Sequence, residues 1–290
     1  MGLKDSGARR GRLLASAAVL GVFGLAGCSA ETSAQWSRLG LPEAASDRAP
    51  VMGEFWINMW IAAMAIGILV WGLIGWTVIA YRRRAGDPQA PRQTRMNLPM
   101  EILYTTVPFL IIGVIFYWTI RVQNEVQHDS GNSDVVVDVV GQKWSWTFNY
   151  KDTARLDDPT AGVYDVGTME QTPTLYLPVN KSVRFNVSSP DVIHSFWVPA
   201  FYFKRDVIPG QPSSFELTPT KEGTYAGKCA ELCGTYHSLM IFDVKVVSEA
   251  EYEQHLQSLA DAGRTGSAMG HADQHDIEGA DPEHKEEGPR

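Results

Sequence analysis

Two long stretches without a charged residue dominate the first half of the chain, at residues 55–81 and 102–120. A helix needs about 20 apolar residues to cross the hydrocarbon core of a bilayer, so each stretch can span one. Tryptophan and tyrosine residues gather towards their ends, as they do at membrane interfaces. We therefore predict a transmembrane helical hairpin over residues 53–122, with helices at about 55–81 and 102–120, in preference to two buried helices of a soluble domain.

The loop between the two predicted helices indicates their orientation. Residues 82–100 contain five arginines against a single acidic residue, Asp87. Short cytoplasmic loops carry an excess of arginine and lysine. We therefore expect this loop in the cytoplasm, and we expect the segments before and after the hairpin to lie outside.

The first 27 residues have the pattern of an export signal. A basic start that ends at Arg12 precedes an apolar run, residues 13–27, which is too short to span a bilayer. The run closes with Leu-Ala-Gly-Cys, which resembles the bacterial lipobox and predicts lipidation of Cys28. An ordinary secretory signal with a chance cysteine is the alternative. We expect a lipoprotein signal peptide over 1–27, an external segment over 28–52, and a multi-pass protein of the bacterial cell membrane whose C-terminal domain faces the periplasm.

From about residue 134 the pattern changes to short runs rich in β-branched and aromatic residues, separated by turn residues. The predicted strands are 134–140, 174–179, 182–187, 192–198, 214–218, 224–228 and 241–247. Short strands at this spacing predict an all-β sandwich or barrel, which we place at residues 123–250. The polar stretch 151–172 is predicted as a surface loop. Residues 251–290 are predicted as the rest of a short helix, 249–262, and a disordered tail.

Charge narrows the range of partners. The net charge of the chain is −8, although basic residues cluster at the N-terminus. Nucleic-acid binding depends on neutralisation of phosphates by lysine and arginine, so we exclude nucleic acid as a partner. An acidic external domain is better suited to a basic protein.

Candidate metal ligands gather in one segment from Cys229 to Met240, which also contains Cys233 and His237; His194 adds a second imidazole upstream. Thiolate, imidazole and thioether ligands select copper rather than magnesium or calcium. Three other interpretations stay open. A structural disulfide leaves the histidine and methionine unexplained. A zinc site of two cysteines and two histidines leaves Met240 without a role. A thiol-based redox protein or copper chaperone has an α/β pattern that differs from the one here.

Four segments carry a family resemblance: Cys-Ala-Glu-Leu-Cys-Gly-x-x-His-Ser-x-Met at 229–240, His-Ser-Phe-Trp-Val-Pro at 194–199, Asp-Val-Ile-Pro-Gly at 206–210 and Gly-Gln-Lys-Trp-Ser-Trp at 141–146. Together they resemble subunit II of cytochrome c oxidase, and the first is similar to that family's loop for the dinuclear copper centre CuA. With the hairpin, the resemblance covers roughly residues 50–250. It implies a two-helix transmembrane hairpin followed by an all-β, cupredoxin-like sandwich domain.

The resemblance also implies a ligand set for two copper ions. The implied ligands are Cys229, Cys233, His194, His237, Met240 and the backbone carbonyl of Glu231. The two cysteine sulfurs would bridge both ions, and each histidine would bind one. The methionine and the carbonyl would be weak ligands of different ions. Two bridging thiolates let one electron be shared between the metals, which suits fast transfer.

Three residues take further roles from the resemblance. The side chain of Glu231 would reach a magnesium ion at the boundary with subunit I. Trp144 matches the tryptophan through which electrons arrive from the docked donor, although Lys143 and Ser145 depart from the usual pattern and leave the detail of docking open. Glu101, at the start of the second membrane helix, matches a glutamate at the mouth of a proton-uptake route. Alternatively, Glu101 marks the membrane boundary and favours the helix N-terminus.

The function implied by the resemblance is electron relay within an oxidase. The chain would accept electrons from a c-type cytochrome at CuA and pass them to haem in subunit I, where oxygen is reduced to water with proton pumping. Its partners would be subunit I, subunit III and membrane lipid. Three rivals remain. A quinol-oxidase subunit II lacks the copper ligands present here, a copper-delivery lipoprotein has no need of the hairpin, and a structural anchor would hold a disulfide and no metal.

Overall fold

The computed structural model describes residues 30–88, 90, 93–151 and 162–269. The predicted signal peptide and Cys28 lie outside these residues, so their predictions are untested. The chain divides into two compact units, Met1–Glu43 and Ala44–Arg290. The described part of the first unit contains the helix α2 (Ala30–Ser37).

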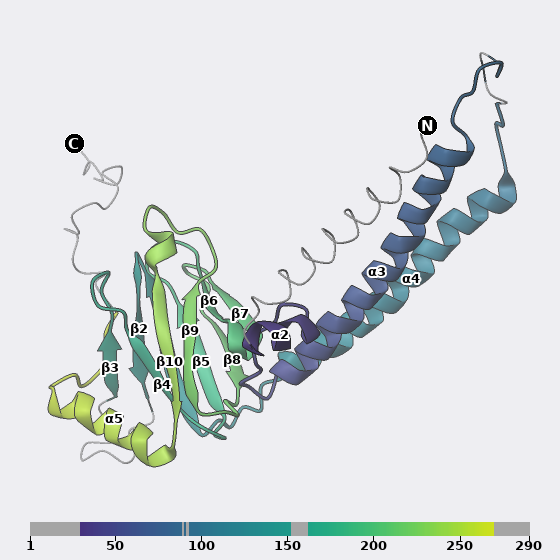
Figure 1. The fold of residues 1–290 in the computed structure, drawn as a ribbon. Coiled ribbons are helices and arrows are strands. Elements are labelled where there is room, and N and C mark those ends of the chain that lie inside the picture. The colour runs from purple at the N-terminus through teal and green to yellow at the C-terminus, as the bar shows by residue number, and fades with distance from the viewer. Residues whose placement is uncertain (1–29, 89, 91–92, 152–161, 270–290) are drawn as a thin grey trace, which may run out of the picture. The chain divides into compact units, whose positions relative to one another are not determined.

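Two long helices open the second unit, α3 (Ala49–Ala80) and α4 (Leu98–Val126), and they run side by side in Figure 1. Both are longer than the uncharged stretches that predicted them, because the helices continue through charged residues such as Glu54 and Arg121. Each has the length and hydropathy to cross a membrane, and its most apolar window is not buried by the described chain. Apolar surface of this extent requires a bilayer or another subunit to cover it.

The β-domain is a sandwich of two five-stranded sheets (Figure 1). The first sheet has the order β3 (Val163–Val166), β2 (Ser145–Tyr150), β1 (Val135–Gln142), β5 (Val183–Ser188) and β8 (Ser213–Leu217). The second has the order β4 (Thr174–Pro178), β10 (Ile241–Val247), β9 (Gly223–Cys229), β6 (His194–Val198) and β7 (Phe203–Val207). The pairs β1/β5 and β4/β10 are parallel, and the other pairs are antiparallel. The predicted helical pair followed by an all-β sandwich is confirmed.

Aromatic residues fill the space between the sheets. Trp146 contacts Phe196 and Phe242 edge to face, at ring-centroid distances of 5.7 and 5.4 Å, and all three rings are buried. Burial of one such side chain stabilises the fold by roughly 1.5–3 kcal/mol. Gly227 on β9 is required by this packing, because a Cβ at that position would collide with the Phe242 ring. The core therefore anchors β6, β9 and β10, the strands that carry the candidate ligands.

The seven strands expected from the sequence are all present, with ends shifted by at most two residues. Three further strands were not among those predicted. β2 alternates polar and aromatic residues, a strand signal that the sequence analysis did not use, although the whole strand is buried. β7 carries the charged run Lys204, Arg205 and Asp206. β3 lies within residues 151–172, so the prediction that this whole stretch is a loop is wrong.

The C-terminal part is partly as expected. Helix α5 (Glu249–Asp261) confirms the predicted short helix. The predicted disorder is wrong for residues 263–269, since Tyr164 N–H donates to the Arg264 carbonyl at 3.1 Å and Ala268 N–H donates to Asn149 Oδ1 at 2.7 Å. Composition does not reveal this segment, because hydrogen bonds to the sheet edge rather than apolar burial hold it.

A short segment before α3 is bonded to the sandwich and to α4. Ala45 N–H donates to the Ala200 carbonyl at 2.9 Å, and Asp47 N–H donates to the Thr218 carbonyl at 2.9 Å. The Arg48 guanidinium donates to the carbonyls of Glu125 and His128 at 3.0 and 3.1 Å. These bonds hold the first turn of α3 and the last turn of α4 beside the β-domain.

Candidate metal centre

Three strands bring the candidate ligands to one end of the second sheet. β6 begins at His194, β9 ends at Cys229, and β10 begins directly after Met240. Because β9 pairs antiparallel with both β6 and β10, these positions lie together. The loop between β9 and β10 carries Cys233 and His237, and a hydrogen bond from Cys229 N–H to the Met240 carbonyl at 2.9 Å closes it.

The two cysteine sulfurs form the middle of this site. Cys229 Sγ and Cys233 Sγ lie 3.9 Å apart, and both residues are free thiols. Cys229 Sγ lies 3.9 Å from His194 Nδ1 and 3.2 Å from the carbonyl oxygen of Glu231. The first thiol therefore has one imidazole and one weaker oxygen donor beside it.

The second thiol has a matching pair of neighbours. Cys233 Sγ lies 3.5 Å from His237 Nδ1 and 3.7 Å from Met240 Sδ. Each sulfur thus has one imidazole nitrogen and one weaker donor at close range. The structure brings together every residue that the sequence analysis named as a copper ligand.

This donor set fits metal held by both thiols. Metal–thiolate bonds are about 2.3 Å long, so one ion can bond to two sulfurs that lie 3.9 Å apart. The ligand atoms of His194, Cys229 and Cys233 all lie within 4.8 Å of one another. Thiolates, imidazoles and a thioether together favour copper. A zinc site of two cysteines and two histidines would leave the buried Met240 sulfur without a role.

Burial and mutual hydrogen bonding set the protonation of the thiols. Cys229 is 5% exposed and Cys233 is 4% exposed. The pKa of Cys229 is lowered, because its hydrogen bond with Cys233 outweighs burial, with a further contribution from His194. The same contact, together with burial, raises the pKa of Cys233. The pair therefore loses one proton readily and retains the second until positive charge enters the site.

Asp191 is a residue of the site that the sequence analysis missed. Its Oδ1 lies 2.8 Å from His194 Nε2, and its carboxylate also accepts from the backbone N–H groups of Lys143 and Val192 at 2.7 and 2.6 Å. Burial lowers the pKa of His194, but hydrogen bonds to Asp191 and Cys229 outweigh it, so the pKa is raised overall. The carboxylate holds the ring with Nδ1 towards the sulfur. Its position three residues before His194 is the one feature of the sequence that could have indicated this role.

Two family models match this chain. The cytochrome c oxidase subunit II periplasmic domain matches residues 135–247, and the transmembrane domain of the same subunit matches residues 34–122. The chain belongs to the cytochrome c oxidase subunit II family. It is therefore a membrane subunit of a haem-copper oxidase with a cupredoxin-like external C-terminal domain.

Individual relatives of subunit II agree with the family models. The chain is 46% identical to a probable cytochrome c oxidase subunit 2 of Streptomyces coelicolor, with 89% of each chain covered. It is 35% identical to the cytochrome c oxidase subunit 2 of Mycobacterium bovis, with 91% of this chain and 87% of that chain covered. The solved periplasmic domain of subunit II from Bradyrhizobium japonicum is 28% identical and covers 45% of this chain and 96% of its own, with a TM-score of 0.39.

Trp144 lies directly against the β9–β10 loop of this subunit II. Its indole Nε1–H donates to the Cys233 carbonyl at 3.1 Å. The ring is only 3% exposed, because Tyr236 packs edge to face against it at 5.0 Å and Gly234 lies over it. A Cβ at Gly234 would lie 3.1 Å from the indole, and its φ of +120° also favours glycine. Tyr236 and Gly234, rather than the indole, therefore form the outer surface at this point.

The two glutamates named from the sequence lie in different environments. Glu231 directs its carbonyl towards the Cys229 sulfur, while its side chain is exposed and accessible to a neighbouring subunit. Glu101 lies in the first turn of α4, where its Oε1 accepts from Asn97 N–H at 2.9 Å. This contact is typical of a helix N-terminus, and the part of Glu101 in proton uptake stays a prediction.

Proposed function

We propose that this chain accepts electrons from a c-type cytochrome at a dinuclear copper centre, CuA, and passes them to haem in subunit I. Oxygen is then reduced to water in subunit I, and this reduction is coupled to proton pumping. One observation carries the proposal. Two free, buried thiols lie 3.9 Å apart, and each has one imidazole and one weaker donor beside it.

Bound copper would supply reversible one-electron chemistry, with the charge change spread over two ions and both thiolates. Cys229, Cys233, His194 and His237 would hold the copper ions, and Met240 Sδ and the Glu231 carbonyl would be the weaker ligands. Because the described ligands are largely buried, little water reorganises when the charge of the site changes. Asp191 keeps the ring of His194 in its orientation through the 2.8 Å contact.

Electrons reach the ligands from the side of the loop where Trp144 lies. Tyr236 and Gly234 form the surface that a donor touches, and the indole lies beneath them. The hydrogen bond from Trp144 Nε1 to the Cys233 carbonyl connects this aromatic pair to a ligand. The net charge of −8 suits a basic cytochrome, and its docking weakens as salt concentration rises.

The remaining parts of the proposal concern the membrane and the partner subunits. Both α3 and α4 cross the bilayer, with the arginine-rich loop in the cytoplasm, as the excess of positive charge supports. Cys28 carries a lipid anchor outside after removal of residues 1–27. Glu101, at the cytoplasmic end of α4, lies at the mouth of a proton-uptake route into subunit I. The exposed carboxylate of Glu231 binds magnesium at the boundary with subunit I, and subunit III completes the complex.

Electron paramagnetic resonance of the full chain, purified in detergent without subunit I and loaded with copper, tests the proposal. We expect one unpaired electron shared equally over two copper nuclei. Cys229→Ser should abolish that spectrum, because one bridging thiolate is lost. Ser238→Ala, an exposed position in the same loop, should leave the spectrum unchanged.

A different result would move the assignment to another class of protein. A spectrum from a single copper nucleus would indicate a copper-delivery protein. A Cys229–Cys233 disulfide without bound copper would indicate a structural role.

A further inference from the structure

A second pocket, apolar at one end and cationic at the other, lies where the first turns of α3 and the last turns of α4 meet strand β7. The pocket there has a volume of about 370 Å³, which is within the usual range for ligand pockets. Its walls pack closely, since a Cβ at Gly53 on α3 would lie 3.2 Å from the ring of Tyr202, beside β7. The pocket lies between helices that match the family's transmembrane domain and a strand of its external domain.

Arg205 is the most informative residue of the pocket wall. It lies on β7 between the buried residues Phe203 and Val207, so it shares their face of the strand. Its guanidinium lies over the rings of Phe203 and Phe215, with centroids at 5.5 and 5.9 Å. Its Nε is buried without a hydrogen-bond partner, and none of the acidic side chains in the described chain pairs with it. A buried donor without a partner costs free energy, and an anionic acceptor in the pocket would satisfy it.

The remaining charge in the pocket has the same sign. Lys204 also lines it, and its only ion pair within the described residues is with Asp206, at 4.0 Å and half exposed. Such an exposed pair is weak. The described lining contains no aspartate or glutamate, and the amides of Gln123 and Gln127 add neutral donors. The pocket is therefore suited to an anion that accepts several hydrogen bonds, such as a phosphate.

The pocket begins at the hydrocarbon boundary and extends through the headgroup layer of a bilayer. Phe55 and Thr119 lie at the outer limits of the two uncharged stretches, and Gln127 lies eight residues beyond Thr119. Eight residues of helix rise about 12 Å, and the polar layer on each side of the hydrocarbon core is about 5–8 Å thick. The pocket thus begins at the hydrocarbon boundary, against Phe55 and Val122, and ends among the charges of β7.

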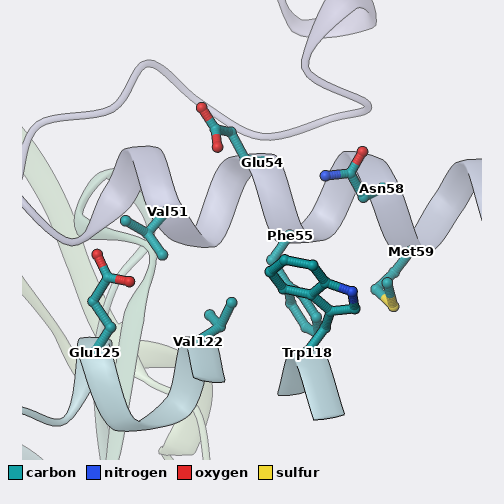
Figure 2. Close-up of a pocket in the computed structure, with 8 residues that line it drawn as sticks. All are labelled: Val51, Glu54, Phe55, Asn58, Met59, Trp118, Val122 and Glu125. Carbon is teal, nitrogen blue, oxygen red and sulfur yellow. The ribbon is translucent and has the colours of Figure 1, made fainter. Parts of the chain in front are cut away.

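A neighbouring pocket between the same helices provides a contrast (Figure 2). It is larger, at about 580 Å³, and it shares the apolar residues Phe55 and Val122. Glu54 on α3 and Glu125 on α4 line it, and their negative charges would repel a phosphate. Figure 2 shows Glu125 close to Val51 and Val122, whereas Glu54 points to the other side of α3. Charge, rather than apolar lining, therefore distinguishes the two pockets.

We propose that the pocket at β7 binds one anionic phospholipid of the outer leaflet. Its phosphate lies at Arg205 and Lys204, and an acyl chain lies along Phe55 and Val122. A phospholipid fits this lining, because its acyl chain would contact the apolar residues near the hydrocarbon core and its phosphate would contact the cations farther out. The proposal depends on the membrane placement of the chain and not on its part in electron transfer.

The test uses the purified oxidase complex that contains this subunit, stripped of loosely bound lipid in detergent. Native mass spectrometry would follow rebinding of phosphatidylglycerol and, separately, phosphatidylcholine. We expect Arg205→Gln to weaken the tightest phosphatidylglycerol site about tenfold or more, because charge-assisted hydrogen bonds are lost. Lys204→Gln should weaken it less. Lys181→Gln removes the same charge from the pair with Glu249 outside the pocket and should have no effect.

A variant that fills the apolar end separates a lipid from a free anion. Val122→Trp keeps both cations, and we expect it also to weaken phosphatidylglycerol binding. If inorganic phosphate displaces the lipid, or if only the Arg205 variant has an effect, the pocket holds an anion rather than a lipid and the proposal is wrong. If Arg205→Gln releases a partner subunit while lipid binding is unchanged, a protein side chain is the occupant and the proposal is also wrong. An unchanged copper spectrum in each variant confirms that the external domain is folded.

Discussion

One histidine packs at each end of the sandwich, and the two differ in their hydrogen bonds and in the direction in which their pKa values are shifted. His194 begins β6 beside the β9–β10 loop, and His255 lies in α5 at the other end of β10, the strand that joins the two regions (Figure 1). His194 contacts an acceptor and a thiol, Asp191 at 2.8 Å and Cys229 at 3.9 Å. Its pKa is raised, because these hydrogen bonds outweigh the opposing effect of burial.

His255 has the opposite surroundings. Its ring stacks on Tyr176 at a centroid distance of 3.7 Å, and its buried Nε2 has no hydrogen-bond partner among the described residues. Burial, with smaller effects of the charges on Lys245 and Arg264, lowers its pKa to about 4. In the proposed function the first histidine binds a metal cation, whereas the second is kept neutral by burial and serves packing.

The largest expected effect follows from replacing each histidine in turn. His194→Asn removes the imidazole nitrogen next to the Cys229 sulfur, so we expect complete loss of the two-copper spectrum. His255→Asn should leave that spectrum unchanged, because no copper ligand lies near α5 in the described chain. Electron paramagnetic resonance of the copper-loaded chain measures both variants under the same conditions. Retention of the spectrum in His194→Asn would remove the distinction between the two ends.

A smaller effect is expected from the carboxylate behind His194. Asp191→Asn keeps the size of the side chain but removes its charge, which supports the orientation and basicity of the ring. Loss of such an outer partner typically lowers metal affinity about 10–100-fold. Competition of the copper-loaded chain with a chelator measures this change. Asp243→Asn, an exposed position on β10, is the matched control, and equal affinities in the two variants would show that Asp191 has only a local structural role.

The candidate copper ligands could be named from the sequence because most of them lie in one short segment. Cys229, Cys233, His237 and Met240 fall within one loop, and their residue types alone favour copper. His194 could be named because the resemblance includes its own segment. The strands beside these ligands were also predicted, since β6, β9 and β10 coincide with the runs 192–198, 224–228 and 241–247 to within two residues.

The remaining features depend on contacts between distant parts of the chain. Asp191 acquires its role only when the turn before β6 places its carboxylate on His194 and on the backbone of Lys143. Trp144 matches the family pattern, yet the sequence does not show that Tyr236 covers it. Arg205 lies in a charged run that does not have the pattern of a strand, so β7 was not predicted. That its Nε is buried without a hydrogen-bond partner can be known only from the structure.

The smallest expected effect concerns the pH dependence of stability at the α5 end. The folded-state pKa of His255 is about 4, against an ordinary value of 6.5, so between these values the unfolded chain binds a proton that the folded chain does not. Stability from this residue is fully present above about pH 6.5 and is lost as pH falls to about 4.

His255→Phe keeps the stacking on Tyr176 but cannot be protonated. As pH falls over this range, we expect the urea midpoint of His255→Phe to fall less than that of the natural chain. The difference corresponds to at most about one proton, which the unfolded natural chain binds and its folded form does not. Because Asp191, His194 and the other titrating groups are common to both chains, they cancel in the comparison. Equal pH dependence in the two chains would mean that His255 is protonated as easily in the folded state as in the unfolded state, and the contrast with His194 would then rest on hydrogen bonding alone.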